Sequence, residues 1–307
     1  MLGIGGGLGV FDGSKAATDK TQPELALETT LMNKQSRRLL ALVFLVLARG
    51  TATVHAASPF PDKNLEAAVR AVLQHDPKTE LTDEKLLNVY VLEAPGKDIH
   101  DLSGLEKCKN LTLLKLTKNK IADIKALKDL ANLQSLDLAE NEIVDIGPLA
   151  GLTKLQYIEL ETNKIADIKP LSGLSALSAI YMGGNQIADL APLAGLTHLS
   201  SLSLPRNKVS NLAPLEKINK LSLLDLKDNE IEDLGPLASQ TDLKILILEK
   251  NKIKDLSPLL KAAKADAEGP KRFAPYLRLF IGGNPLSDDA KSTQLDGLKK
   301  AGVRNEG

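Results

Sequence analysis

The stretch LQSLDLAENEIVDIGPLAGLTK, residues 133–154, decides the fold, because residues 155–176 repeat its pattern as LQYIELETNKIADIKPLSGLSA. Seven copies of its asparagine follow one another 22 residues apart without an insertion: Asn119, Asn141, Asn163, Asn185, Asn207, Asn229 and Asn251. The length of 307 residues alone would suggest about two compact domains. A strict 22-residue period instead predicts an array of stacked repeats that share one apolar core.

Each unit contains a short alternation of leucine with variable residues, as in Leu136 and Leu138 around Asp137. This pattern predicts a strand with one face in the core and one in solvent, and stacked units would form a parallel sheet. The solvent-facing positions then form two rows. The central row is Lys115, Asp137, Glu159, Tyr181, Ser203, Asp225, Ile247 and Phe280. The flanking row is Leu113, Ser135, Tyr157, Ala179, Ser201, Leu223, Ile245 and Arg278.

The second half of each unit predicts turns. Prolines recur there, so we expect short 3₁₀ or extended segments on the convex side. A column of aspartates precedes them: Asp123, Asp145, Asp167, Asp189, Asp233 and Asp255, with Asn211 in the remaining place. Calcium is the alternative interpretation, but one carboxylate per coil offers too few converging oxygens. We interpret the column as side chains that accept backbone N–H bonds at a turn, and the asparagines as partners of backbone groups in adjacent coils.

The ends of the array need caps. Residues 57–88 predict a helical N-terminal cap, with Asp62 as an N-cap, Leu65, Val69, Ala71 and Val72 on its apolar face, and a second short helix after Thr82. The repeats span 89–286, and an 11-residue insertion at about 260–275 moves the last repeat asparagine, Asn284, 33 residues beyond Asn251. Residues 287–307 predict a short amphipathic helix with Ala290, Leu295 and Leu298 on its apolar face.

Residues 32–56 have the order of a signal peptide. Lys34, Arg37 and Arg38 precede the apolar run 39–48, and cleavage after Ala56 or Ala57 would follow small residues. A membrane anchor is the alternative, but the run has about half of the roughly 20 residues that a spanning helix needs. We therefore expect no transmembrane segment and a secreted, periplasmic or cell-envelope protein. Residues 1–31 are interpreted as a mis-set start or a disordered extension.

Composition argues against several other classes of protein. The 39 Lys and Arg residues balance 39 Asp and Glu residues, so the chain lacks the basic excess of a nucleic-acid binder. One cysteine, Cys108, allows neither an internal disulfide nor a cysteine zinc site. The four histidines are scattered through the sequence, and no catalytic or phosphate-binding motif occurs. We expect no enzyme, no cofactor and no metal.

The 22-residue unit with N-x-I-x-D-I/L-x-P-L resembles the internalin family and the related phosphatase-regulator type of leucine-rich repeat. The segments Phe60 to Gln74 and Leu81 to Ala94 are similar to the helical cap of internalin-type proteins. The resemblance implies an α/β solenoid with a short parallel sheet on the concave face and a secreted binding function. No cell-wall sorting motif or C-terminal apolar anchor is visible, so an adhesin or invasion role is not implied.

Two groups of side chains on the predicted sheet are candidates for binding. The first is acidic and bears tyrosines, which favours a protein or peptide partner with Lys or Arg. Its residues, with their neighbours in the central row, are Asp137, Glu140, Tyr157, Glu159, Glu161, Tyr181, Ser203 and Asp225. An ordinary solvated face is the alternative. The second group, Leu223, Ile245, Ile247 and Phe280, is apolar, and we expect the insertion to cover it.

Three functions remain open from the sequence alone. An extracytoplasmic, monomeric protein-binding module agrees with the leader and with the tyrosines. An intracellular phosphatase-regulator-like scaffold agrees with the repeat type but not with the leader. A self-associating envelope component would differ from both in light scattering of the purified chain.

Overall fold

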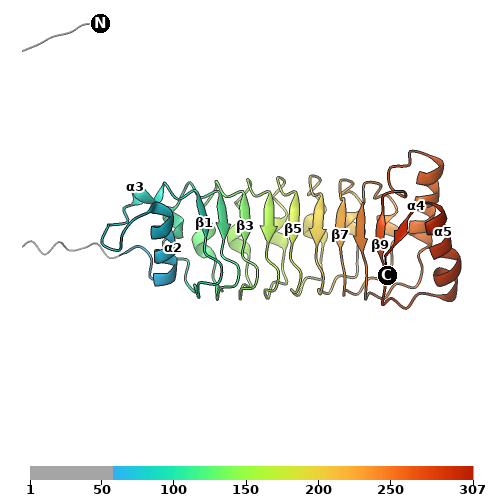
Figure 1. The fold of residues 1–307 in the computed structure, drawn as a ribbon, viewed down its shortest axis with the longest axis horizontal. Coiled ribbons are helices and arrows are strands. Elements are labelled where there is room, and N and C mark those ends of the chain that lie inside the picture. The colour runs from blue at the N-terminus through green and yellow to red at the C-terminus, as the bar shows by residue number, and fades with distance from the viewer. Residues whose placement is uncertain (1–57, 307) are drawn as a thin grey trace, which may run out of the picture. The chain divides into compact units, whose positions relative to one another are not determined.

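A computed structural model describes residues 58–306, so the predicted signal peptide and the segment 1–31 lie outside the described residues. Within them, ten short strands form one parallel sheet in chain order (Figure 1). The strands are β1 (Val91–Glu93), β2 (Leu113–Lys115), β3 (Ser135–Asp137), β4 (Tyr157–Glu159), β5 (Ala179–Tyr181), β6 (Ser201–Ser203), β7 (Leu223–Asp225), β8 (Ile245–Ile247), β9 (Arg278–Phe280) and β10 (Arg304–Asn305). This arrangement confirms the leucine-rich-repeat solenoid.

The core is a set of leucine and isoleucine columns, one residue from each coil. Leu136 pairs in register with Leu114 on one side and Ile158 on the other, and all three side chains are fully buried. Each coil exposes apolar surface at its two ends, and the next coil covers it. The stack is therefore stabilised by burial between coils rather than within one.

The return half of seven coils forms a 3₁₀ turn, and five of these turns contain one of the recurring prolines, whereas Pro258 lies at the start of helix α4 (Ser257–Glu268). The seven turns are η1 (Leu105–Lys107), η2 (Lys125–Leu127), η3 (Gly147–Leu149), η4 (Lys169–Leu171), η5 (Ala191–Leu193), η6 (Ala213–Leu215) and η7 (Gly235–Leu237). Every member of the aspartate column, and Asn211 in its gap, accepts a hydrogen bond of 2.7–3.1 Å from the backbone N–H two residues later. The interpretation of this column as turn caps is confirmed.

Helix α2 (Lys63–Leu73) and helix α3 (Asp83–Leu86) form the N-terminal cap. Asp62 is the N-cap of α2, and its second carboxylate oxygen accepts the N–H of His100 at 2.8 Å, which ties the cap to the first coil. The apolar face of α2 differs in part from the prediction. Leu65 and Val69 are buried, whereas Ala71 and Val72 are exposed because that side of the helix faces away from β1.

The insertion forms helix α4 (Ser257–Glu268), which begins 22 residues after the start of η7. It therefore continues the column of 3₁₀ turns. Its neighbours are η7, the π-helical segment η8 (Ala290–Gln294) and helix α5 (Leu295–Lys300). Our expectation that the segment 260–275 covers Leu223, Ile245, Ile247 and Phe280 is wrong, because the helix grows on the side opposite to the sheet.

The C-terminal cap contains the predicted helix, α5, with Leu298 buried and Ala290 buried in η8. The sequence did not predict the last strand, β10, which pairs with β9 and adds Arg304 beside Arg278. No helix within residues 58–306 is both long and apolar enough to cross a membrane.

Candidate binding surface on the sheet

The solvent-facing side of the ten strands is called the sheet face below. Both predicted rows are confirmed residue by residue, since Tyr157 pairs with Ser135 and Ala179, and Glu159 pairs with Asp137 and Tyr181. Because each pair of neighbouring strands from β1 to β9 is in register over three residues, the side chains of each row stand about 4.8 Å apart on a rigid support.

Two tyrosines lie at the centre of the sheet face. The rings of Tyr157 and Tyr181 are 5.6 Å apart between centroids and inclined by 40°. The Tyr157 hydroxyl donates a hydrogen bond to the Glu159 carboxylate. Burial and the charge of Glu159 raise the pKa of Tyr157, so this hydroxyl keeps its proton and stays a donor at neutral pH. The pair thus presents half-buried aromatic surface in a fixed position.

Two carboxylates adjoin the tyrosines. Among the described residues neither Glu159 nor Glu161 forms an ion pair with a Lys or Arg side chain. Burial raises the pKa of Glu161, the charge of Glu159 raises it further, and Arg206 opposes both. The two carboxylates thus lie at the centre of the sheet face without an ion pair to a Lys or Arg side chain among the described residues, an arrangement that favours a cationic group of a partner.

The other predicted site residues are held by contacts within the chain. Asp137 is only 6% exposed and pairs with Lys115 Nζ at 2.8 Å. Ser203 is buried, and its hydroxyl donates to Asp225 Oδ2 at 3.4 Å. Burial raises the pKa of the Asp225 carboxyl, although hydrogen bonds from Lys227 N–H and from Ser203 oppose the shift. Asp137 and Ser203 are thus buried among neighbouring side chains and offer little surface to a partner.

Glu140 lies at the rim of the sheet face, where its side chain is exposed and its carboxylate is 3.4 Å from Lys118 Nζ. The structure therefore brings together Tyr157, Glu159, Glu161 and Tyr181, with Asp225 two strands away from Tyr181.

Sequence reasoning placed Lys115 in the central row but did not pair it with Asp137, and it did not connect Arg206 with Glu161. Lys115 precedes Asp137 by 22 residues in the same row, and this spacing was a signal for their ion pair. The charge of Arg206 acts to lower the pKa of Glu161 from two coils away, and only the stacking geometry brings the two residues near each other.

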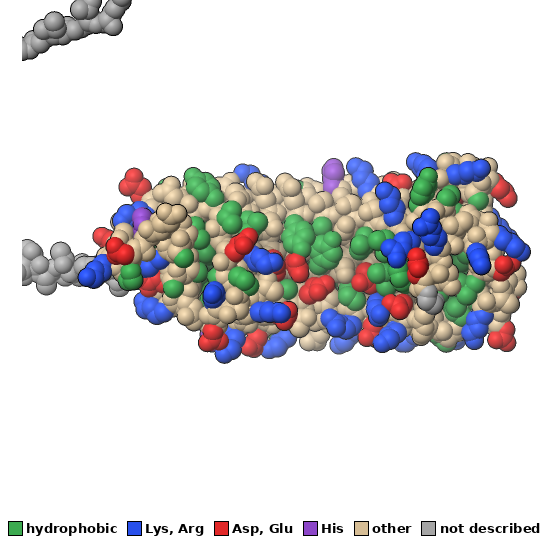
Figure 2. All heavy atoms as spheres, in the orientation of Figure 1, with side chains coloured by type: hydrophobic (Ala, Val, Ile, Leu, Met, Phe, Trp, Pro, Cys, Tyr) green, Lys and Arg blue, Asp and Glu red, His purple; other side chains and the backbone are tan. Residues whose placement is uncertain are grey.

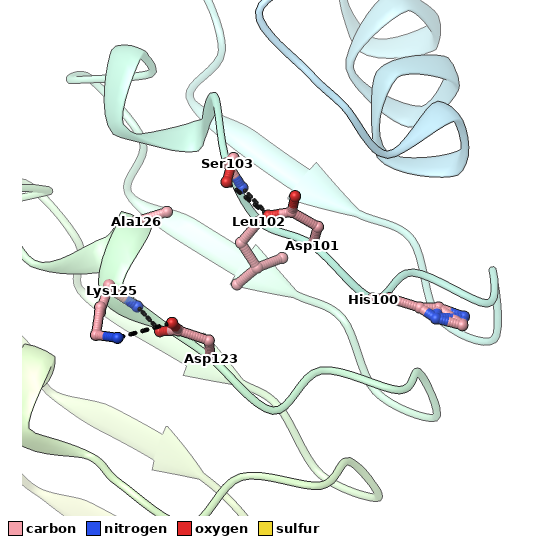
Figure 3. A pocket seen from close by; sticks show the side chains of 7 residues that line it. All are labelled: His100, Asp101, Leu102, Ser103, Asp123, Lys125 and Ala126. Atoms are coloured by element: carbon pink, nitrogen blue, oxygen red, sulfur yellow. Dashed lines mark hydrogen bonds and ion pairs between the residues drawn. The ribbon is translucent and has the colours of Figure 1, made fainter.

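A small pocket lies away from the sheet face, along the aspartate column of the first two coils (Figure 3). It is lined by His100, Asp101, Leu102, Ser103, Asp123, Lys125 and Ala126. Figure 3 shows Asp101 turned toward Ser103 and Asp123 toward Lys125, and both carboxylates accept hydrogen bonds from their own turns. Within residues 58–306 no group of three or more His, Cys, Asp or Glu side chains could hold a metal ion. The absence of enzymatic activity stays a prediction.

Known proteins with the same architecture are leucine-rich-repeat proteins. A family model for leucine rich repeats, in two copies, matches residues 131–173. An internalin, InlF, from Listeria monocytogenes is 31% identical with a TM-score of 0.70, over 81% of this chain and 78% of that chain. Internalin C2 from the same organism is 36% identical with a TM-score of 0.63, over 66% of this chain and 92% of that chain. The chain belongs to the internalin family. This internalin therefore has the fold of a protein-binding module.

More distant structures share only the fold of this internalin. A plant peptide hormone receptor, RGFR1, in complex with RGF2 is 20% identical with a TM-score of 0.53, over 66% of this chain and 32% of that chain. No sequence among the curated proteins matches.

Proposed function

We propose that this internalin is a secreted, monomeric binding module whose sheet face captures a protein or peptide segment that carries Lys or Arg. The observation that carries the proposal is the group Tyr157, Tyr181, Glu159 and Glu161, in which an aromatic pair adjoins two carboxylates without a cationic partner among the described residues. Aromatic anchors bind with large buried area and small loss of side-chain entropy. The adjacent carboxylates would select a basic segment and steer its approach.

The site also lacks features that a small-molecule pocket needs. The surface extends over ten strands. At about 4.8 Å per strand it is on the order of 40 Å long, which suits an extended peptide or a protein surface. A small-molecule binding pocket would instead enclose most of its ligand.

Binding to a captured partner tests this function. The purified chain is compared with a triple variant, Glu159→Lys, Glu161→Lys and Tyr181→Ala. We expect at least about a hundredfold loss of affinity, since two charge reversals and one aromatic truncation act at the centre of the contact. A matched control, Glu216→Lys with Glu232→Lys, changes two exposed carboxylates outside the sheet rows. Equal affinity of the triple variant and the unaltered chain would refute the proposed surface.

Secretion is tested separately by the N-terminus of the mature chain. Mass spectrometry of the protein from culture medium or from the envelope fraction should find a chain that begins at Ala57 or Ser58. A cytosolic chain that retains residues 32–56 would contradict secretion and favour the intracellular scaffold.

A further inference from the structure

A second group of exposed and half-buried side chains lies on the same sheet face, over β7 to β10. Leu223 and Ile245 are neighbours in the flanking row, and Ile247 and Phe280 are neighbours in the central row. All four are partly exposed, and the insertion that we expected to cover them packs on the opposite side. The result is a half-buried apolar strip that begins three strands beyond Glu159.

Two arginines border this strip at its C-terminal end. Arg278 and Arg304 pair in register on β9 and β10, and both side chains are exposed. The Arg278 guanidinium lies 5.3 Å from the centroid of the Phe280 ring, and its Nε is 3.0 Å from the Glu306 carboxylate. Among the described residues Arg304 has no ion pair, so only one of the two adjacent arginines has an acidic partner.

The charge of the sheet face therefore changes along its length: Glu159 and Glu161 lie on and just after β4, apolar side chains lie beside Asp225 on β7 to β9, and two arginines lie on β9 and β10. In Figure 2 acidic side chains lie near the middle of the sheet, and several Lys and Arg side chains lie over the C-terminal strands with acidic side chains among them. A ligand whose charges run the other way would place like charges together in both places, which disfavours that orientation.

We propose that the sheet face binds an extended segment of a partner protein in one charge order. A basic side chain lies over Glu159 and Glu161, and an apolar side chain followed by an acidic one lies over Ile245, Ile247 and the two arginines. Four strand steps of about 4.8 Å separate β4 from β8, which is roughly 19 Å, or about six residues of extended chain. This inference rests on the proposed function and adds the order and spacing of the ligand.

Two labelled peptides of identical composition test the charge order. The first carries Lys-Lys, a Ser-Thr spacer of about six residues, Leu-Phe and Asp-Asp; the second has the Lys and Asp pairs exchanged. Fluorescence anisotropy at low salt is expected to show the first peptide binding at least about tenfold more tightly. The variant Arg278→Glu with Arg304→Glu should abolish this preference. A control with the same change of charge on the opposite side, Lys261→Glu with Lys264→Glu, should keep it.

The possible results separate the two proposals. Equal binding of both peptides that is lost in Glu159→Lys with Glu161→Lys overturns the charge order and leaves the proposed function standing. Binding of neither peptide at millimolar concentration also overturns the charge order, and the captured partner then decides the proposed function alone. A preference for the first peptide that persists after Arg278→Glu with Arg304→Glu overturns the role of the arginines.

Discussion

The Asn163 side-chain amide joins two coils, because its Nδ2 donates to the carbonyl of Leu138 in the preceding coil at 3.0 Å. It also donates to Leu160 O of its own coil, and its Oδ1 accepts Ile143 N–H at 2.9 Å. The same contacts recur at every in-register asparagine from Asn119 to Asn251. One side chain thus satisfies backbone groups that the turn would otherwise bury without partners.

Asn163→Leu should lower the free energy of unfolding by about 1–3 kcal/mol, because buried backbone donors and acceptors lose their partners. Chemical denaturation followed by circular dichroism measures the change. Asn211→Asp is a matched control, since aspartate fills that place in the other coils and accepts the same turn bond. An Asn163→Leu chain as stable as the unaltered one would show that the hydrogen bonds of the asparagines between coils do not stabilise the fold.

Gln240→Leu should stabilise the protein by about 1 kcal/mol. Gln240 is 1% exposed, and its Oε1 has no hydrogen-bond partner among the described residues. It occupies a column in which the other coils have Leu130, Leu152, Leu174, Leu196 and Ile218. The carbonyl of Leu215, which accepts from Gln240 Nε2, still accepts the N–H of Ile218 after the substitution. Thermal unfolding should show a higher midpoint for leucine and a lower one for Gln240→Ala, which leaves a cavity.

Asp266 makes the end of helix α4 and the turn after it sensitive to acid. Its buried carboxylate accepts the N–H groups of Arg272, Phe273 and Ala274 at 2.9–3.0 Å. Burial acts to raise the pKa of Asp266, but these hydrogen bonds and the charge of Arg272 hold it below the ordinary 3.8. A lowered pKa means that the stabilisation is complete above the unfolded-state value and is lost as the pH falls through the folded-state value.

Asp266→Ala should therefore cost about 1–3 kcal/mol at pH 7, and the cost should be smaller at the lowest pH at which the chain is still folded, because the folded-state pKa lies below 3.8. Urea unfolding at both pH values measures it. Glu268→Ala, an exposed carboxylate on the same helix, serves as the control. The interpretation fails if the cost of Asp266→Ala is as large in acid as at neutral pH.

The Cys108 thiol reports on the N-terminal cap. It is fully buried, and this burial, together with the nearby charge of Glu106, raises the pKa of the thiol to about 12. The folded chain should resist a thiol reagent at pH 8, because labelling requires local opening. Asp62→Ala should speed labelling several-fold, as it frees the cap helix from His100, whereas Asp76→Ala removes bonds only within its own turn. Rapid labelling of the unaltered chain would mean that the cap is open.

The sequence predicted most of the repeat architecture because each coil solves the same packing problem. Leu136, Asn141 and Asp145 recur at one spacing, so their strand, inter-coil and turn roles follow from the period. The path of the insertion could not be predicted from the repeat pattern. Its place beside the column of 3₁₀ turns depends on helix α4 beginning at Ser257, the position that starts a 3₁₀ turn in the preceding coil. The position of Arg304 beside Arg278 could not be predicted either, because β10 lies beyond the repeats and only its register with β9 brings the two arginines together.

Carboxyl footprinting of the chain, alone and with its captured partner, tests the sheet face as the binding surface most directly. The account predicts that the partner reduces labelling of Glu159 and Glu161, while Asp145 and Asp167 in the turn column keep their labelling rates. Protection of Asp145 and Asp167, with Glu159 and Glu161 labelled as in the free chain, would place the partner on the opposite side and contradict it.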